Sequence, residues 1–263
     1  MLKKIKFSKM VASGNDFVVV DSLSGKLNLK KIAIAICNRK FGIGADGLLV
    51  LEKSKVANVK MRIFNADGSE AEMCGNGARC TAYYIGKNKP DLETKAGIIQ
   101  SFVGKSSVRI RLTDPKDLKL DIPLVLRSRN LRVNFINTGV PHTVIFVNDI
   151  DNINVASIGR DVRFHKEFSP LGTNVNFVEV LNKNSIRVRT YERGVEDETL
   201  ACGTGSSASA LIFALKTGYL GSINVHTQSK EILKVYFKRK ENIIFDTWLE
   251  GKAKIVYKGE YYV

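Results

Sequence analysis

The chain has 263 residues, of which 44% are hydrophobic and 25% are charged, so it can bury a sizeable core without metals or disulfides. Its formal net charge of +15 comes from lysines and arginines spread along the whole length, and no long run of like charges forms a basic tail. This pattern indicates a lysine-rich solvated surface, and we expect no nucleic-acid partner.

The N-terminal segment carries positive charges without an apolar run behind them, and no stretch of the chain is long and apolar enough to cross a membrane. We therefore expect no signal peptide, no membrane partner and a cytoplasmic location. In that reducing compartment, the four cysteines are expected to be thiols and not a disulfide framework.

Short β-rich runs alternate with a few helical stretches in the first half of the chain. Apolar alternation and β-branched residues predict strands at 17–21, 47–51, 59–64, 98–103 and 107–112. Helical spacing of apolar residues predicts helices at 29–39 and 78–85, and a turn is expected at 21–25. The polar stretch 113–123, which contains two prolines, is predicted to be a linker.

The second half repeats this order of elements. Strands are predicted at 131–137, 143–147, 176–180, 186–191, 223–227, 232–238, 243–249 and 254–257, with a helix at 206–215.

A short motif occurs once in each half. The residues Glu70-x-x-x-Cys74-Gly75-Asn76-Gly77 recur as Glu198-x-x-x-Cys202-Gly203-Thr204-Gly205. Each copy follows a strand that contains an arginine and an aromatic residue, and each precedes a helix of small residues. This agreement predicts a duplication, with two similar domains whose loops meet in one cleft, a usual place for a small-molecule site.

Each of these cysteines precedes a predicted helix. The neighbouring glycines allow a tight turn, and the N–H groups of the first helical turn can bind a carboxylate and stabilise a thiolate. Two such loops suit the inversion of a carbon centre, because a thiolate on one face can remove a proton while a thiol on the other face delivers one. No lysine site for pyridoxal phosphate is recognisable, so we expect no cofactor.

Other roles remain open for several of these residues when they are considered alone. Cys37 and Cys80 lie in predicted helices and are expected to be buried as small apolar residues. The spacing of Cys74 and Cys80 does not suit zinc, and we expect no metal site. A redox pair of Cys74 and Cys202 is an alternative to a pair of bases. Arg193 could instead pair with nearby acidic residues.

Taken together, the motifs resemble those of the diaminopimelate epimerase family and follow in the same order over most of the chain. The matching segments are Gly14-Asn15-Asp16-Phe17, Gly42-Ile43-Gly44-x-Asp46, Arg62 to Glu70, Cys74 to Cys80, Pro141-His142, Thr173 to Phe177, Tyr191 to Gly194 and Glu198 to Gly205. Gly47 and Val140 depart from the pattern, because many members have glutamine and asparagine there.

The resemblance implies an isomerase that interconverts LL- and meso-2,6-diaminopimelate in lysine and peptidoglycan precursor biosynthesis, without a cofactor. The implied fold is mixed α/β, with two pseudo-symmetric domains that each wrap a curved sheet around a central helix. We expect these domains at 1–122 and 123–251, with a final strand from about 252 to 263 that returns to the first domain. A homodimer is also implied.

The resemblance implies a role for each site residue as well. Cys74 and Cys202 would be the two catalytic bases, while His142 and Glu192 would modulate their protonation. The residues implied to bind substrate are Asn15, Asn65, Gly75, Asn76, Asn174, Glu192, Arg193, Gly203 and Thr204. Independently of the family, Arg193 can bind a carboxylate in a bidentate way, and Glu192 could pair with an ammonium group. A proline or hydroxyproline type of racemase with the same two cysteines is the alternative.

Overall fold

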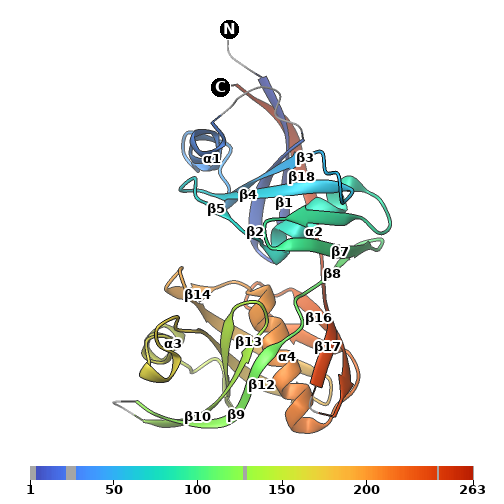
Figure 1. The fold of residues 1–263 in the computed structure, drawn as a ribbon. Coiled ribbons are helices and arrows are strands. Elements are labelled where there is room, and N and C mark those ends of the chain that lie inside the picture. Colours follow the sequence, from blue (N-terminus) through green and yellow to red (C-terminus); the bar gives the residue numbers. More distant parts are fainter. Residues whose placement is uncertain (1–3, 22–27, 127–128, 242, 263) are drawn as a thin grey trace. The chain divides into compact units, whose positions relative to one another are not determined.

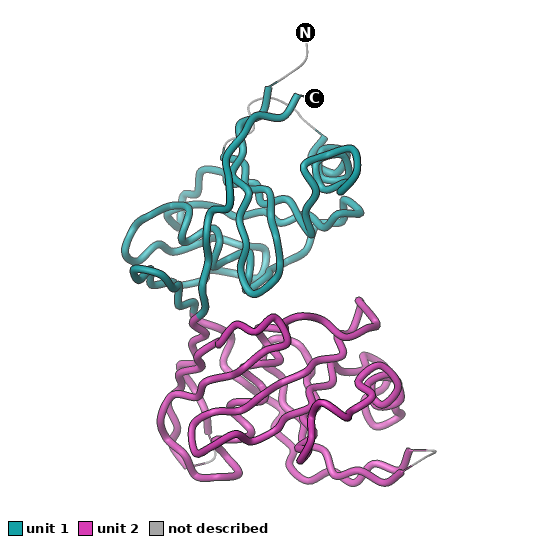
Figure 2. Tube along the Cα trace, turned by 180° about the vertical axis from the view of Figure 1, so that it is seen from behind, with its two compact units in different colours: residues 1–110, 251–263 teal, residues 111–250 magenta. Residues whose placement is uncertain are grey.

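The computed structural model describes residues 4–21, 28–126, 129–241 and 243–262 (Figure 1). Most of the predicted turn at 21–25 lies outside these residues. The chain divides into two compact units, which we call unit 1, residues 1–110 and 251–263, and unit 2, residues 111–250 (Figure 2). Each unit has its own sheet and helices, and the expected mixed α/β class in two similar halves is confirmed.

Unit 1 is a mixed sheet with two helices. Its strands are β1 (Lys4–Ala12), β2 (Asn15–Asp21), β3 (Gly47–Glu52), β4 (Val59–Asn65), β5 (Glu70–Ala71), β6 (Asp91–Thr94), β7 (Gly97–Val103), β8 (Val108–Arg111) and β18 (Lys254–Tyr262). Its helices are α1 (Leu29–Cys37) and α2 (Gly75–Ile85). The C-terminal strand β18 pairs antiparallel with β1, so the end of the chain returns to the first sheet.

The two helices of unit 1 differ in how deeply they are buried. α1 packs one apolar face, which includes Ile32 and Ile36, against Val18 and Val50 of the sheet. α2 is buried along most of its length and contacts β1, β2, β3, β4, β6, β7 and β18. Because strands surround α2, the first turn of this helix is held in a fixed position.

Unit 2 repeats the arrangement of a mixed sheet around a buried helix. Its strands are β9 (Lys116–Val125), β10 (Asn130–Asn137), β11 (Pro141–Phe146), β12 (Asn174–Asn182), β13 (Ser185–Glu192), β14 (Asp197–Thr199), β15 (Ile223–His226), β16 (Ile232–Lys240) and β17 (Ile243–Gly251). The helices are α3 (Val155–Arg163), a short 3-10 turn (Lys166–Phe168) and α4 (Gly203–Thr217). α4 is the buried helix of this unit and contacts β10, β11, β12, β13, β15 and β16.

Some elements differ from the sequence-based predictions. The stretch 113–123 is mostly part of β9, an exposed strand paired with β10, and not a linker. The compact units divide between Ile110 and Arg111, and the functional domain bounds expected at residue 122 stay a prediction. The strands β1, β5, β6 and β14 and the helix α3 were not predicted at all. No helix in the described residues is long and apolar enough to cross a membrane.

The contact between α3 and β13 yields a stability prediction. Gly159 of α3 lies against Tyr191, and a Cβ at this glycine would be 2.5 Å from the Tyr191 Cβ and 2.7 Å from its Cγ. Gly159→Ala should therefore lower the free energy of unfolding by about 1–3 kcal/mol through overpacking. Urea unfolding followed by circular dichroism measures this change.

Ser157→Ala, on the exposed side of the same helix, is the matched control and should leave the free energy of unfolding nearly unchanged. Equal stability of Gly159→Ala and the wild type would contradict the close packing of α3 on Tyr191.

Candidate active site

Cys74 lies at the start of the buried helix α2. It is the N-cap residue, with extended backbone (φ −143°, ψ 122°), and its carbonyl accepts a hydrogen bond from the Ala78 N–H at 2.8 Å. The N–H groups of Gly75, Asn76 and Gly77 therefore belong to the first turn and have no carbonyl partner within the helix. Such a turn can bind a carboxylate and stabilise a thiolate.

Cys202 occupies the same position at the start of α4 in unit 2. Its backbone is extended (φ −110°, ψ 114°), and its carbonyl accepts from the Ser206 N–H at 2.8 Å. The Cys202 Sγ also accepts from the Gly205 N–H at 3.4 Å. Gly205 has to be glycine here, because a Cβ would overlap the side-chain oxygen of Asn176.

A bidentate ion pair braces the hairpin that leads to each cysteine. In unit 1 the Arg62 guanidinium donates to both carboxylate oxygens of Glu70, at 2.8 and 3.1 Å. In unit 2 Arg189 donates to both oxygens of Glu198, at 2.7 Å each. Arg62 also holds the pKa of Glu70 at about 2, below its usual range, despite partial burial. The duplication predicted from the sequence thus extends to these supporting contacts.

The candidate binding residues lie at equivalent strand ends in the two units. β2 is parallel to β3, which is antiparallel to β4, and β11, β12 and β13 have the same arrangement. Asn15 begins β2 and Asn65 ends β4. In unit 2, His142 is the second residue of β11, Asn174 begins β12 and Glu192 ends β13. Each unit therefore gathers its polar residues at one end of its sheet.

Asn15 and Asn76 are in direct contact in unit 1. The Asn76 side-chain N–H donates to the Asn15 Oδ1 at 2.5 Å, and the Asn76 Oδ1 accepts from Arg79 at 2.7 Å. Arg79 is 0% exposed and also donates to the Ser13 hydroxyl at 2.7 Å. The Asn15 side-chain N–H in turn donates to Asp46 at 3.0 Å. Because arginine only donates and a carboxylate only accepts, both amides have a fixed orientation.

Further ion pairs hold Asp46, which ends the hydrogen-bonded series from Arg79 through Asn76 and Asn15. Arg39 donates to Asp46 at 2.7 Å and to Asp16 at 2.9 Å, and Lys9 pairs with Asp16 at 2.7 Å. These partners keep the pKa of Asp16 far below its usual range, although burial alone would raise it. Sequence reasoning missed Arg79 and Asp46 as supports of the site. A charged residue among the small residues that follow Cys74 was the available signal.

Asn65 and Gly47 have different surroundings. Asn65 is exposed in the turn between β4 and β5, where its side chain donates to the Ser69 hydroxyl at 2.9 Å. Gly47 pairs with Asn65 in the sheet, and a Cβ at Gly47 would lie 2.9 Å from the Phe64 carbonyl oxygen. A glutamine at position 47 would therefore require this backbone to shift.

His142 is connected to Cys202 through Thr204. The His142 Nε2 lies 2.9 Å from the Thr204 Oγ1, which lies 3.4 Å from the Cys202 Sγ. On its other side, the His142 Nδ1 is 3.1 Å from the side-chain nitrogen of Asn176. Burial, followed by the charge of Arg193, lowers the pKa of His142 to about 3. The imidazole is therefore neutral near neutral pH.

Asn174 and Arg193 are joined by a hydrogen bond. The Asn174 Oδ1 accepts from the Arg193 backbone N–H at 2.9 Å, and its side-chain nitrogen donates to the Pro141 carbonyl at 2.9 Å. The Arg193 guanidinium donates to the Leu171 carbonyl at 3.1 Å. Among the described residues, Glu196 pairs with Arg163 at 3.2 Å, and the alternative ion pair of Glu196 with Arg193 is not observed.

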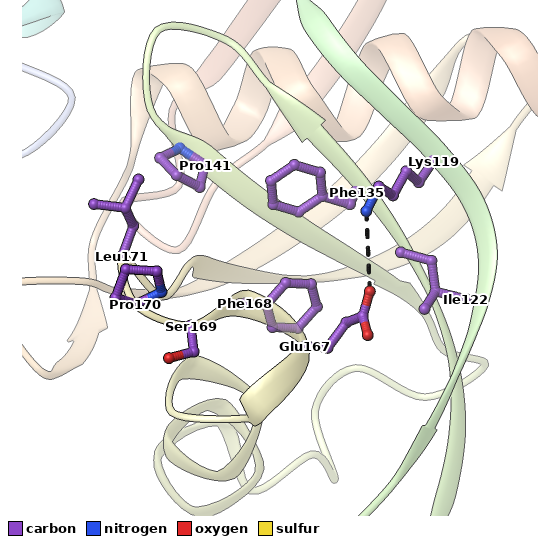
Figure 3. Close-up of a pocket in the computed structure, with 9 residues that line it drawn as sticks. All are labelled: Lys119, Ile122, Phe135, Pro141, Glu167, Phe168, Ser169, Pro170 and Leu171. Carbon is purple, nitrogen blue, oxygen red and sulfur yellow. Dashed lines mark ion pairs between the residues drawn. The ribbon is translucent and has the colours of Figure 1, made fainter.

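Pro141 and Leu171 also line a pocket of about 190 Å³ within unit 2 (Figure 3). Its walls are mainly apolar, and the rings of Phe135 and Phe168 stack there with centroids 5.7 Å apart. No residue predicted to bind substrate lines this pocket. The pocket thus lies beside the residues whose carbonyl groups accept hydrogen bonds from Asn174 and Arg193.

Glu192 is a carboxyl group in a largely desolvated position. Its Oε2 accepts a hydrogen bond from the Thr199 hydroxyl at 3.0 Å. Burial raises the pKa of Glu192 above its usual range, although the Thr199 hydrogen bond opposes this shift. The carboxyl group is therefore easier to protonate than an exposed glutamate, a property often found in groups that exchange protons.

The remaining cysteines are core residues. Cys37 is 2% exposed and Cys80 is 0% exposed, and none of the four cysteines forms a disulfide. Burial raises the pKa of the Cys37 thiol to about 11, which keeps it protonated. Within the described parts of the chain, no three histidine, cysteine or acidic side chains gather as potential metal ligands.

Comparisons with known proteins agree with this geometry. The family model described as diaminopimelate epimerase matches residues 7–110 and 134–256. The diaminopimelate epimerase of Caldanaerobacter subterraneus is 41% identical over 97% of this chain and 99% of its own length, and that of Methanocella arvoryzae is 42% identical over 98% and 97%.

Among solved structures, a phenazine biosynthesis protein of the PhzF family from Bacillus anthracis shares the fold. Its TM-score is 0.77 at 19% identity, and the match covers 99% of this chain and 100% of that chain. The sequence relationship is much closer to the epimerases, and it extends over nearly the whole chain. The chain therefore belongs to the diaminopimelate epimerase family, a family of isomerases.

Proposed function

We propose that this protein interconverts LL-2,6-diaminopimelate and meso-2,6-diaminopimelate without a cofactor, with Cys74 and Cys202 as the two bases. The observation that carries this proposal is the repeated placement of a cysteine at the start of a buried helix, in a chain that belongs to the diaminopimelate epimerase family. Each cysteine has the same backbone environment, so either can act as acid or as base.

The reaction is a transfer of one proton to and one from the α-carbon. A thiolate on one cysteine removes the α-proton, and the thiol of the other cysteine delivers a proton to the opposite face. The proposed carboxylate site is formed by the N–H groups of Gly75 and Asn76 and those of Gly203 and Thr204. These donors stabilise the charge that spreads onto the carboxylate in the transition state.

The distal end of the substrate carries a second carboxylate and a second ammonium group. We propose that Asn15, Asn65, Asn174 and Arg193 bind this end. Arg193 suits the carboxylate because guanidinium groups bind carboxylates with two parallel hydrogen bonds. Glu192 suits an ammonium group, and together with His142 it modulates the protonation of the thiols.

The biological setting is also a proposal. We infer a cytoplasmic homodimer that acts in lysine and peptidoglycan precursor biosynthesis. We further propose that the functional domains are 1–122, with a return strand from about 252, and 123–251. Light scattering of the purified protein measures its molar mass in solution, and the mass of a monomer would contradict the proposed homodimer.

A second candidate function is racemisation of proline or hydroxyproline by the same two cysteines. Kinetics with diaminopimelate, proline and hydroxyproline distinguish the two. We expect turnover of diaminopimelate alone, because the guanidinium of Arg193, whose backbone N–H donates to Asn174, could bind the second carboxylate that proline and hydroxyproline lack.

The cysteine pair yields the first functional prediction. Cys74→Ala and Cys202→Ala should each lower the rate of epimerisation by about 10²–10⁴-fold or more, because each removes one proton-transfer group. Proton NMR in deuterium oxide follows both inversion and solvent exchange at the α-carbon. Cys80→Ala, at a buried cysteine outside the site, is the matched control and should retain activity. Normal epimerisation by either Cys74→Ala or Cys202→Ala would refute the two-base reaction.

Glu192 yields a prediction of stability against pH. Its folded pKa is raised above the unfolded value near 4.5, so the folded state holds the proton more tightly and loses stability as pH rises through the folded pKa. Glu192→Gln has no charge to desolvate and should therefore be more stable than the wild type at pH 7, but not at pH 4.

Urea unfolding at the two pH values measures this difference. Epimerase activity of the same variant should fall, because the glutamine cannot exchange a proton. A Glu192→Gln protein that is less stable than the wild type at pH 7 would contradict the desolvation of Glu192.

A further inference from the structure

Unit 2 contains a continuous chain of four polar side chains that ends at the Cys202 sulfur. It runs from Asn176 to His142, with nitrogen atoms 3.1 Å apart, from His142 to Thr204 at 2.9 Å, and from Thr204 to the Cys202 Sγ at 3.4 Å. Asn176 and His142 are each 0% exposed. Solvent therefore cannot substitute for either of them as a hydrogen-bond partner.

The partners of Asn176 fix the orientation of its amide. The Asn176 nitrogen lies 3.0 Å from the Thr143 carbonyl oxygen, and its oxygen lies 3.0 Å from the Thr190 hydroxyl. A carbonyl oxygen can only accept, so the NH₂ group must point to Thr143. The same NH₂ group then faces the His142 Nδ1, which has to accept its second hydrogen.

This orientation determines where the hydrogen atoms of the next two groups lie. A neutral imidazole carries one N–H, so when the His142 Nδ1 accepts, the hydrogen is on Nε2. The Nε2–H then donates to the Thr204 Oγ1. The single hydroxyl hydrogen of Thr204 is left to point towards the Cys202 sulfur, which also receives the Gly205 N–H at 3.4 Å.

We infer that Asn176 is a positioning residue, which holds His142 as the Nε2–H tautomer and thereby makes the Thr204 hydroxyl a hydrogen-bond donor to the Cys202 sulfur. A sulfur that receives two hydrogen bonds is stabilised as the thiolate. This series of hydrogen bonds thus favours the thiolate form of Cys202, which is the form that can act as a base. Its importance for turnover rests on the proposed function, whereas the tautomer and the hydrogen bond do not.

The same position in unit 1 is arranged differently. Asn76 takes the place of Thr204 after the cysteine and glycine, and its amide is directed to Asn15 and Arg79. Asn76 therefore serves the network of unit 1, and the directed chain through a histidine belongs to unit 2. The inference is specific to Cys202 for this reason.

The first test is the tautomer of His142 in the intact protein, read from the ¹⁵N NMR signals of its ring nitrogens. The chain has only three histidines, and replacement of His165 and His226 leaves the signals of His142. We expect Nδ1 without hydrogen in the wild type. In Asn176→Asp the new carboxylate can only accept, so Nδ1 should carry a hydrogen. A wild-type Nδ1 that carries hydrogen would overturn the inference.

The second test measures the reactivity of Cys202 and does not depend on the Asn176 variant. In a Cys74→Ala background, iodoacetamide should alkylate Cys202 in preference to the other cysteines at neutral pH, because Cys202 is 8% exposed whereas Cys37 is 2% and Cys80 0% exposed. Adding Thr204→Val removes the hydroxyl donor and should lower the alkylation rate about tenfold or more, since hydrogen bonds to charged groups are strong. Thr204→Ser keeps the hydroxyl and should restore the rate.

An alkylation rate unchanged by Thr204→Val, with the fold intact by circular dichroism, would overturn the inference. Neither measurement uses diaminopimelate. A protein that passes both tests and fails to epimerise diaminopimelate would therefore refute the proposed function alone, and the opposite result would refute the positioning role alone.

Discussion

The site in each unit depends on the N–H groups in the first turn of a buried helix. α2 and α4 are surrounded by their own sheets, so these turns are held rigidly and partly away from water. Buried donors without a strong partner destabilise the folded state, and an anion bound there removes that cost. A thiolate and a substrate carboxylate are both anions, so one backbone feature can stabilise the base and bind the reacting group.

The two units keep this backbone feature and differ in the side chains beside it. In both, the residue that follows the cysteine and glycine contacts a residue at the start of an equivalent strand. In unit 1 this contact joins Asn76 to Asn15, and in unit 2 it joins Thr204 to His142. An amide pair fixed by Arg79 binds polar groups but does not titrate, whereas the histidine and threonine pair reaches the sulfur itself. The two units thus have equivalent scaffolds and differ at two contacting positions, which hold an amide pair in unit 1 and a histidine and threonine pair in unit 2.

The sequence was sufficient for features that depend on local pattern. The predicted strands, the helix α1 and the repeated cysteine loops follow from alternation, helical spacing and glycine placement, and all are present. β9 was missed because most of its side chains are exposed and it contains Pro123, so it lacks the alternation of a half-buried strand. Asn176 could not be assigned, because it resembles an ordinary surface residue until long-range contacts bury it. By contrast, α3 has apolar residues at helical spacing after the cap residue Asn154, and this signal was available.

The last glycine of each cysteine motif shows why the sequence repeats more strictly than the chemistry requires. At Gly77 a Cβ would lie 3.1 Å from a methyl carbon of Leu49, and at Gly205 it would overlap the Asn176 amide oxygen. In both units the glycine lets a strand approach the first turn of the helix, but the strand presents an apolar side chain in one case and a polar one in the other. In unit 2 His142 and Asn176 come from the paired strands β11 and β12, and the glycine lets the first turn of α4, with Thr204, lie close to them, so a residue chosen for space also affects which hydrogen bonds can form. The glycine therefore belongs to the support of Cys202 as much as to the turn itself.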